Sequence, residues 1–221
     1  MIDFKTNIEK QIEFLGGIDV NPLCEAEKDV VKDNVKDFIS IEKRFNSKLP
    51  VEYRFFYDKY GAFCFNNRVY TKSEDMISQL GWGEELRADF FYSLSDTSKC
   101  SVWRALDKLA SPGGDLLPIC YGLSGDLICL DLGSENYGKV YYWFHEGYEN
   151  ETLFLIANDF YSFIMSLEVD TEAMTPVVDE DTKSEDKETD GGKITTIITP
   201  ELLELLRKSG HEPKNYKLRG E

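Results

Sequence analysis

The chain has 221 residues, of which 42% are hydrophobic and 13% aromatic, and it carries a formal net charge of −16. This length suits one large domain, or a medium domain with an appendage, and the composition is sufficient for a hydrophobic core. The charge argues against binding to nucleic acid, since phosphates require Lys and Arg, and against an anionic membrane surface. It favours a basic partner.

The charge is distributed unevenly. Ten carboxylates and two lysines lie between Glu168 and Asp190, so this segment holds −8 of the −16. A stretch so acidic and so poor in large apolar side chains buries too little surface to fold by itself. We therefore expect residues 1–168 to form one domain, residues 169–193 a disordered acidic linker, and residues 194–221 a C-terminal helix and tail.

The cysteines are odd in number and none forms a C-x-x-C pair; they are Cys24, Cys64, Cys100, Cys120 and Cys129. This pattern argues against a disulfide framework and against a zinc site. It predicts reduced, mostly buried thiols in a cytoplasmic protein that needs no metal and no cofactor. The first residues, MIDFKTNIEKQIEF, are amphipathic and mixed in charge, unlike a signal peptide. No apolar run approaches the roughly 20 residues of a membrane span.

Three helices and a hairpin are predicted in the first third of the chain. Apolar side chains at spacings of four, four and three predict a helix over residues 4–15, which Gly16 ends. Residues 25–45 predict a second helix. A third begins at Pro50, which suits a first turn, and ends at Gly61. The apolar residues expected to face inward on the second helix are Val31, Val35, Phe38, Ile39 and Phe45.

The middle of the chain mixes clear and ambiguous patterns. The segment AFCFNNRVYT, residues 62–71, has two short apolar runs around Asn66 and Asn67 and predicts a hairpin. Ser73 suits the N-cap of a helix that packs through Met76, Ile77 and Leu80. Residues 81–94 give no clear pattern, and residues 95–109 predict another helix.

Residues 117–146 are rich in β-formers and predict an antiparallel meander. Its strands cover residues 117–121, 126–131 and 139–145. Both faces of these strands carry apolar side chains. Such a sheet is covered on both faces, or keeps one aromatic face for a partner.

Two further helices are predicted near the C-terminus. Residues 157–167 form a helix that packs back on the sheet and closes the domain. Beyond the acidic segment, Thr199 and Pro200 begin a helix that Gly210 ends, and a tail that leans basic follows. Together these elements indicate an α+β fold with a mainly antiparallel sheet flanked by helices.

Three segments in this order resemble the SUKH superfamily, which comprises bacterial immunity proteins and the fungal Smi–Knr regulators of cell-wall synthesis. IEKRFNSKLPVEYRFFYDKYG matches a helix with Glu, then Leu-Pro, then an aromatic helix that ends in Gly. LPICYGLSGDLICLDL matches an apolar strand, a Gly-Asp turn and a strand that closes on Asp. GKVYYWFHE, followed by NDFYSFIMSL, matches a Val-Tyr-aromatic strand with His-Glu and a Phe-rich closing helix.

The resemblance covers about Lys32 to Leu167 and rests on the order and spacing of the segments, because each one alone is common. The matching residues are Glu42, Leu49, Pro50, Tyr53, Phe56, Gly61, Ile119, Gly125, Asp126, Leu130, Asp131, Val140, Tyr142, Trp143, His145, Glu146, Phe160 and Phe163. The N-terminal helix and everything after Glu168 lie outside the usual domain. Roles for those parts are therefore not implied by the resemblance.

Catalytic chemistry has few candidates in this sequence. His145 and Glu146 form the most plausible acid–base pair. However, adjacent residues on a strand point to opposite faces, which favours a surface histidine at a strand end. No cysteine lies in a nucleophile motif, and the glycine turns SPGGD and GLSGD lack the Lys-Ser/Thr of a phosphate loop. The sequence therefore predicts a protein that is not an enzyme.

The expected function is binding, through an acidic surface that carries aromatic side chains. The resemblance implies an immunity protein, which binds and neutralises a basic toxin domain, often a nuclease, as a stoichiometric plug. The alternative is a regulatory scaffold of the cell-wall type, in which the C-terminal helix recruits further proteins. The residues predicted to contact the partner are Asp126, Asp131, Glu135, Tyr137, Tyr141, Trp143, His145, Glu146, Tyr148 and Glu149.

Overall fold

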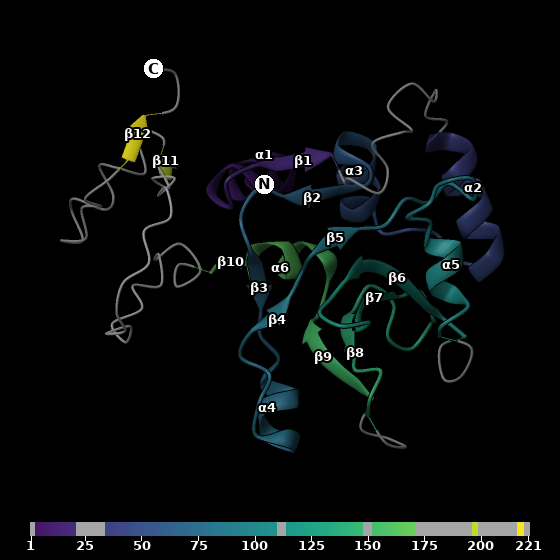
Figure 1. Cartoon of the computed structure of the whole chain (residues 1–221). Coiled ribbons are helices and arrows are strands. Elements are labelled where there is room, and N and C mark those ends of the chain that lie inside the picture. The colour runs from purple at the N-terminus through teal and green to yellow at the C-terminus, as the bar shows by residue number, and fades with distance from the viewer. Residues whose placement is uncertain are drawn as a thin grey trace, which may run out of the picture. The chain divides into compact units, whose positions relative to one another are not determined.

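A seven-stranded antiparallel sheet organises the first of two units in the computed structural model (Figure 1). The structure describes residues 3–20, 34–109, 114–147, 152–170, 196–198 and 216–218. The units cover Met1–Pro176 and Val177–Glu221. In spatial order the strands are β1 (Ile18–Val20), β2 (Phe63–Phe65), β5 (Phe90–Phe91), β6 (Leu116–Tyr121), β7 (Leu127–Asp131), β8 (Val140–Trp143) and β9 (Leu153–Ala157).

A second, three-stranded sheet has the order β10 (Glu168–Val169), β3 (Val69–Thr71) and β4 (Leu86–Arg87). Consecutive strands thus pass from one sheet to the other: β2 leads into β3, and β4 leads into β5. The backbone stays paired at this corner, where Ala88 N–H donates to Val69 C=O at 3.0 Å. The chain is therefore still backbone-paired as it leaves the small sheet, and β10 extends one residue beyond the predicted domain end at residue 168.

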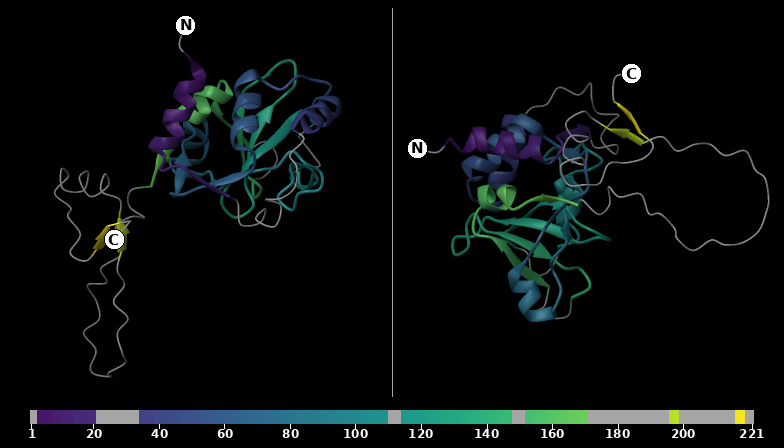
Figure 2. Two further views of the ribbon diagram at one scale, coloured as in Figure 1. Left: turned by 90° about the horizontal axis from the view of Figure 1, so that it is seen from above. Right: turned by 90° about the vertical axis from the view of Figure 1, so that its left-hand side faces the viewer.

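Helices α1 (Phe4–Phe14), α3 (Val51–Tyr60) and α6 (Phe160–Met165) contact one another and form one layer (Figure 2). Each presents the apolar stripe that its sequence predicts. Phe56 of α3 lies at the centre, with its ring 4.9 Å from that of Phe91 and 5.1 Å from that of Phe160. The other helices of the described residues are α2 (Asn34–Phe45), α4 (Glu74–Leu80) and α5 (Val102–Leu106). The predicted α+β class, an antiparallel sheet flanked by helices, is confirmed.

The predicted hairpin over residues 62–71 is wrong. β2 pairs with β1 and β5, whereas β3 pairs with β10 and β4, so the two strands do not pair with each other. The two asparagines serve the end of α1 instead. Asn67 Nδ2 donates to Leu15 C=O at 3.0 Å, and Asn66 Nδ2 donates to Gly16 C=O at 2.8 Å. They bond carbonyls that the helix end leaves without partners.

Two predicted helices differ from the structure. On α2, Phe38 and Phe45 are buried as expected, but Val35 and Ile39 are 66% and 59% exposed, so their predicted inward orientation is wrong. The helix predicted over residues 95–109 is limited to α5, because the segment before it turns and Ser93 bridges Ser101 instead. The part of the second helix before residue 34 lies outside the described residues.

The prediction that all five cysteines are reduced is wrong for Cys100, which is disulfide-bonded. Cys64, Cys120 and Cys129 are free thiols, and the last two are completely buried in adjacent strands. Burial raises the pKa of Cys120 well above its ordinary value, so its thiol stays protonated and unreactive.

The second unit contains β11 (Thr196–Ile198) and β12 (Tyr216–Leu218), which pair in parallel with Thr196 opposite Tyr216. β12 lies in the segment that the sequence indicated as a basic tail. The predicted acidic linker beyond residue 170 and the predicted helix between β11 and β12 lie outside the described residues.

Candidate functional site

The two faces of the large sheet differ in how well they are covered. Cross-strand partners share a face, so the registers define rows of side chains across the strands. On the face toward α3 and α6, one row runs across five strands, and each member is at most 2% exposed; we call it the covered row. Its members are Phe91, Cys120, Ile128, Tyr142 and Phe154.

The row on the opposite face is also apolar and is mostly half-buried; we call it the open row. Its members are Phe90, Tyr121, Leu127, Trp143 and Leu153. Only Leu127 is fully buried, between Tyr121 and Trp143 on the neighbouring strands. The rings of Phe90 and Tyr121 stack 5.0 Å apart, and Lys108 Nζ lies 5.7 Å from the centre of the Tyr121 ring. A continuous, half-exposed apolar row of this kind is typical of a contact surface.

Tyr141 belongs to the same face, two residues before Trp143, and pairs across the strands with Cys129 and Leu155. Burial raises the pKa of the Tyr141 hydroxyl, and the negative charges of Asp131 and Asp75 raise it further. Acidic groups therefore lie close to the aromatic surface at this point. Two of the predicted contact residues, Tyr141 and Trp143, are thus placed together on the open face.

β9 is the last strand of the large sheet, and its outer edge is hydrogen-bonded by side chains of the α4 segment. Ser73 Oγ donates to Leu155 C=O at 2.7 Å, and Leu155 N–H donates to Asp75 Oδ2 at 3.1 Å. Ser73 also caps α4 by accepting from Met76 N–H at 3.1 Å. These bonds occupy backbone groups that an edge strand would otherwise offer to a partner strand. Contact with a partner is therefore better suited to the face of the sheet than to this edge.

Asp126 is not a rim carboxylate, because it is only 6% exposed and fully hydrogen-bonded. Tyr142 Oη donates to its Oδ2 at 2.5 Å, while its Oδ1 lies 3.0 Å from His145 N and 2.6 Å from His145 Nδ1. Burial and the negative charge of Asp126 both raise the pKa of Tyr142. The network fastens the segment after β8 to the turn before β7, so Asp126 and His145 position the end of β8.

His145 is hydrogen-bonded to Asp126 and not to Glu146. His145 Nε2 lies 3.9 Å from Glu146 Oε1, too far for a hydrogen bond, whereas Nδ1 bonds Asp126. An Asp–His pair can serve a nucleophile, but among the described residues no hydroxyl or thiol is hydrogen-bonded to His145 Nε2. Nor do the described residues include three or more His, Cys, Asp or Glu side chains grouped to hold a metal ion.

Asp131 is likewise buried, at 8% exposure, at the end of β7. Its Oδ1 accepts from Gly133 N–H at 2.8 Å and stabilises the turn that follows. Burial raises the pKa of Asp131, while the Gly133 N–H and the charge of Lys139 partly offset this effect. Glu135, in the same loop, is exposed. Of the acidic residues predicted for contact, Glu135 and Glu146 are therefore the exposed ones, and Glu149 lies outside the described residues, as does Tyr148.

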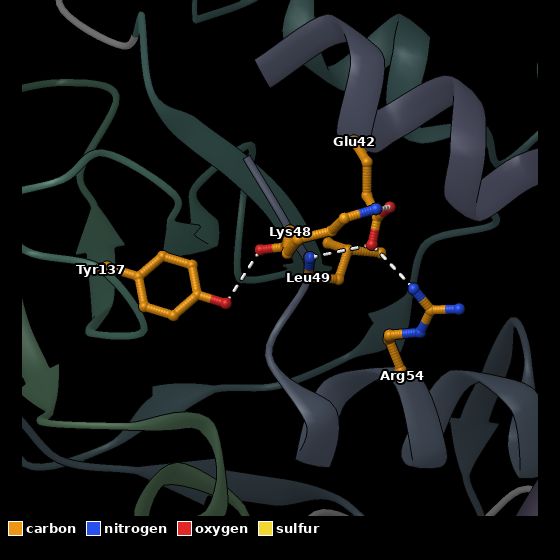
Figure 3. A network of polar contacts seen from close by, with 5 residues as sticks. All are labelled: Glu42, Lys48, Leu49, Arg54 and Tyr137. Atoms are coloured by element: carbon orange, nitrogen blue, oxygen red, sulfur yellow. Dashed lines mark hydrogen bonds and ion pairs between the residues drawn. The ribbon is translucent and has the colours of Figure 1, made fainter. Parts of the chain in front are cut away.

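Tyr137 lies at the other end of β8 from His145 and contacts the α2–α3 connection. Its hydroxyl donates to Lys48 C=O at 2.9 Å (Figure 3). Tyr137 lies in the turn before β8 and His145 in the turn after it, so the 4-residue strand Val140–Trp143 stands between them. The predicted residues thus lie within β8 and in the turns at both of its ends rather than in a single cluster.

Glu42 of α2 organises the connection that Tyr137 contacts (Figure 3). Its side chain is 9% exposed; Oε1 accepts from Leu49 N–H at 3.2 Å and from Arg54 at 2.7 Å, and Oε2 from Lys48 Nζ at 2.7 Å. Burial raises the pKa of Glu42, but the Lys48 and Leu49 bonds and the nearby cations outweigh it and leave the pKa below its ordinary value. One carboxylate therefore joins the end of α2 to the start of α3.

Of the open row, only Trp143 was among the predicted contact residues, so sequence reasoning missed Phe90, Tyr121, Leu127 and Leu153. The pattern around Phe90 was ambiguous, and the strand that holds Leu153 was not predicted. The apolar run LFLIA at residues 153–157 was the available signal, because short β-rich runs between polar segments are typical of strands.

Comparison with known proteins identifies the family. The model of the SMI1 / KNR4 family (SUKH-1) matches residues 34–166, which is more than half of the chain. The match includes α2 to α6 and β2 to β9, and therefore the whole open row and Glu42. No curated protein and no solved structure matches the chain.

Proposed function

The chain belongs to the SMI1 / KNR4 family (SUKH-1), and from this premise we propose that it is an immunity protein that binds and neutralises a toxin domain. Domains of this family are generally non-catalytic binding domains. The observation that carries the proposal is the open row, an apolar surface across five strands that the helix layer leaves half-exposed. Burial of this surface holds the complex together.

The proposed partner is a basic protein, with a nuclease toxin as the leading example. The negative charges of Asp131 and Asp75 act on Tyr141 of the open face, and the chain carries a net charge of −16. Such a charge accelerates association with a cationic partner. The immunity protein then acts as a stoichiometric plug, in which aromatic burial slows dissociation and no bond is made or broken.

A second candidate function is a regulatory scaffold. The observation that favours it is the second unit, Val177–Glu221, which lies beyond the family match and pairs its own strands β11 and β12. A scaffold would use this unit to recruit proteins that do not contact the open row.

Location is part of the proposal. None of the described helices combines the length and the apolar character that a membrane span requires. We propose a cytoplasmic protein, as toxin neutralisation inside the producing cell requires.

The test begins with capture of partners from the source organism by tagged full-length protein and by two open-row variants, Tyr121→Ala and Trp143→Ala. The control is Phe55→Ala, a half-buried aromatic side chain on α3 that packs against Phe4. Each captured protein is then expressed alone in a heterologous host, and growth is measured with and without the chain. Thermal melts of all variants identify any that are simply unfolded.

Immunity predicts one basic protein, held at one to one, that arrests growth unless the full-length chain is present. Protection should be lost with folded Trp143→Ala and retained with Phe55→Ala. Several non-toxic proteins, held equally by wild type and Trp143→Ala, would indicate the scaffold. Protection that survives both open-row substitutions would show that the open row is not the contact surface.

A further inference from the structure

The exposed face of α2 is apolar at one end and cationic at the other. Val35, Ile39 and Lys43 follow one another at a spacing of four, so they share one side of the helix. The buried side is formed by other residues, including Phe38, Ile41 and Phe45. Val35 and Ile39 are among the most exposed large apolar side chains of the described residues. This stripe is therefore not needed to pack the domain.

A hollow of about 340 Å³ opens beside this stripe; its lining consists of Ile39, Glu42, Lys43, Asn46, Ser47 and Lys48. Glu42 is the only acid among the described residues of the lining, and its carboxylate is already paired with Lys48 and Arg54. Lys48 remains 83% exposed, so its ammonium group can also face a ligand. The hollow is consequently cationic on a chain whose net charge is −16.

Tyr137 extends the apolar part of this surface. Its ring is exposed, and its hydroxyl is fixed by the bond to Lys48 C=O (Figure 3). Glu42 also holds the α2–α3 connection in place, because its carboxylate accepts from Leu49 N–H. The backbone beside the hollow is therefore fixed by hydrogen bonds. Apolar side chains next to two lysines suit a ligand that combines apolar and acidic groups.

We propose that this surface, comprising Val35, Ile39, Lys43, Lys48 and Tyr137, binds an acidic amphipathic segment of a partner protein. Apolar side chains of the segment pack on Ile39 and Val35, and its carboxylates pair with Lys43 and Lys48. The preferred charge is opposite to that of the toxin proposed above, and no residue is shared with the open row. The two surfaces can therefore be occupied by different partners, and one proposal can fail without the other.

The probe is a fluorescein-labelled helical peptide with leucines at every third or fourth position and glutamates between them. Two control peptides replace its glutamates by lysines or its leucines by alanines. Fluorescence anisotropy measures binding to the full-length chain. Ile39→Ser and Lys43→Glu test the surface, while Phe14→Ser and Lys10→Glu are matched controls, because Phe14 and Lys10 are exposed on α1.

We expect the acidic peptide to bind at least about tenfold more tightly than either control peptide. An exposed ion pair contributes a modest energy, so Lys43→Glu should weaken binding roughly five- to tenfold, with Ile39→Ser similar. Added salt should weaken binding, because the charges are exposed. Phe14→Ser and Lys10→Glu should leave binding unchanged, and hydrogen exchange should slow at residues 39–48.

Any of three results would overturn the proposal. The three peptides could bind with equal affinity, the acidic peptide could fail to bind, or Ile39→Ser and Lys43→Glu could leave its affinity unchanged. Sedimentation equilibrium of the unliganded chain tests the other possible occupant. A dimer that dissociates in the Ile39→Ser variant but not in the Phe14→Ser variant would assign the surface to a second copy of the chain. That result would also overturn the proposal.

Discussion

Replacement of Glu42 by Ala should lower the free energy of unfolding by about 2–4 kcal/mol. Three contacts are lost, and they differ in value. Leu49 N–H is buried and loses its acceptor, which costs about 1–3 kcal/mol. The Lys48 pair contributes only about 0–1 kcal/mol, because Lys48 is exposed to water. Arg54 keeps its position over the Phe38 ring, 4.6 Å away, and is partly solvated once its carboxylate is removed.

Replacement of the same residue by Gln separates the charge from the hydrogen bond. The side-chain amide of the Glu42→Gln variant keeps an oxygen for Leu49 N–H, so we expect this substitution to cost about half as much as Glu42→Ala. The pKa of Glu42 is lowered in the folded protein, so its charge stabilises the fold above the ordinary value of 4.5, and this contribution is lost as the pH falls through the folded-state pKa. The difference between wild type and Glu42→Gln should therefore shrink at acidic pH.

Urea denaturation followed by tryptophan fluorescence at several pH values measures these effects. Glu13→Ala removes an exposed helical carboxylate and should change the unfolding free energy by less than about 0.5 kcal/mol. A loss for Glu42→Ala no larger than that of Glu13→Ala would refute the reasoning. So would a Glu42→Gln difference that grows as the pH falls.

Two further substitutions test the edge of the sheet and the turn after β7. Ser73→Ala removes the α4 cap and the bond to Leu155 C=O. It should lower the free energy of unfolding, measured by urea denaturation, by about 2 kcal/mol and increase light scattering on storage. Unchanged stability would contradict both roles. Asp131→Asn keeps an acceptor for Gly133 N–H but removes a buried charge whose pKa burial raises, so it should stabilise the fold near neutral pH. That gain should fade toward acidic pH, because protonation of Asp131 then stabilises wild type; a variant less stable at neutral pH than wild type would disprove the account.

Much of the fold could be predicted because local patterns and tertiary packing agree there. The structure contains the stripe of α1, the caps of α3 at Pro50 and Gly61, and the meander β6–β8. The exposed face of α2 could not be predicted in the same way. Its apolar residues form one continuous arc of about 160° at roughly 100° per residue, so periodicity alone did not show that Ile41 and Glu42 face inward while Ile39 faces out.

The candidate site was predicted in part, for a related reason. Trp143 and Tyr141 alternate with buried residues on a clear strand, so their place on one face follows from the pattern. Asp126 has the sequence features of a surface carboxylate in a turn. Its burial depends on Tyr142 and His145, which lie 16 and 19 residues away and carry no local signal for that pairing.

The pairing of the strands that carry the open row has a consequence for the thermodynamics of recognition. Because the strands that carry the open row are paired on both sides, or hydrogen-bonded by the α4 segment at β9, their backbone is already ordered before a ligand binds. A ligand that packs on Tyr121 or Trp143 would immobilise only side chains with two rotatable bonds each. Little conformational entropy then opposes association, which is the advantage of a preorganised surface over a segment that folds as it binds.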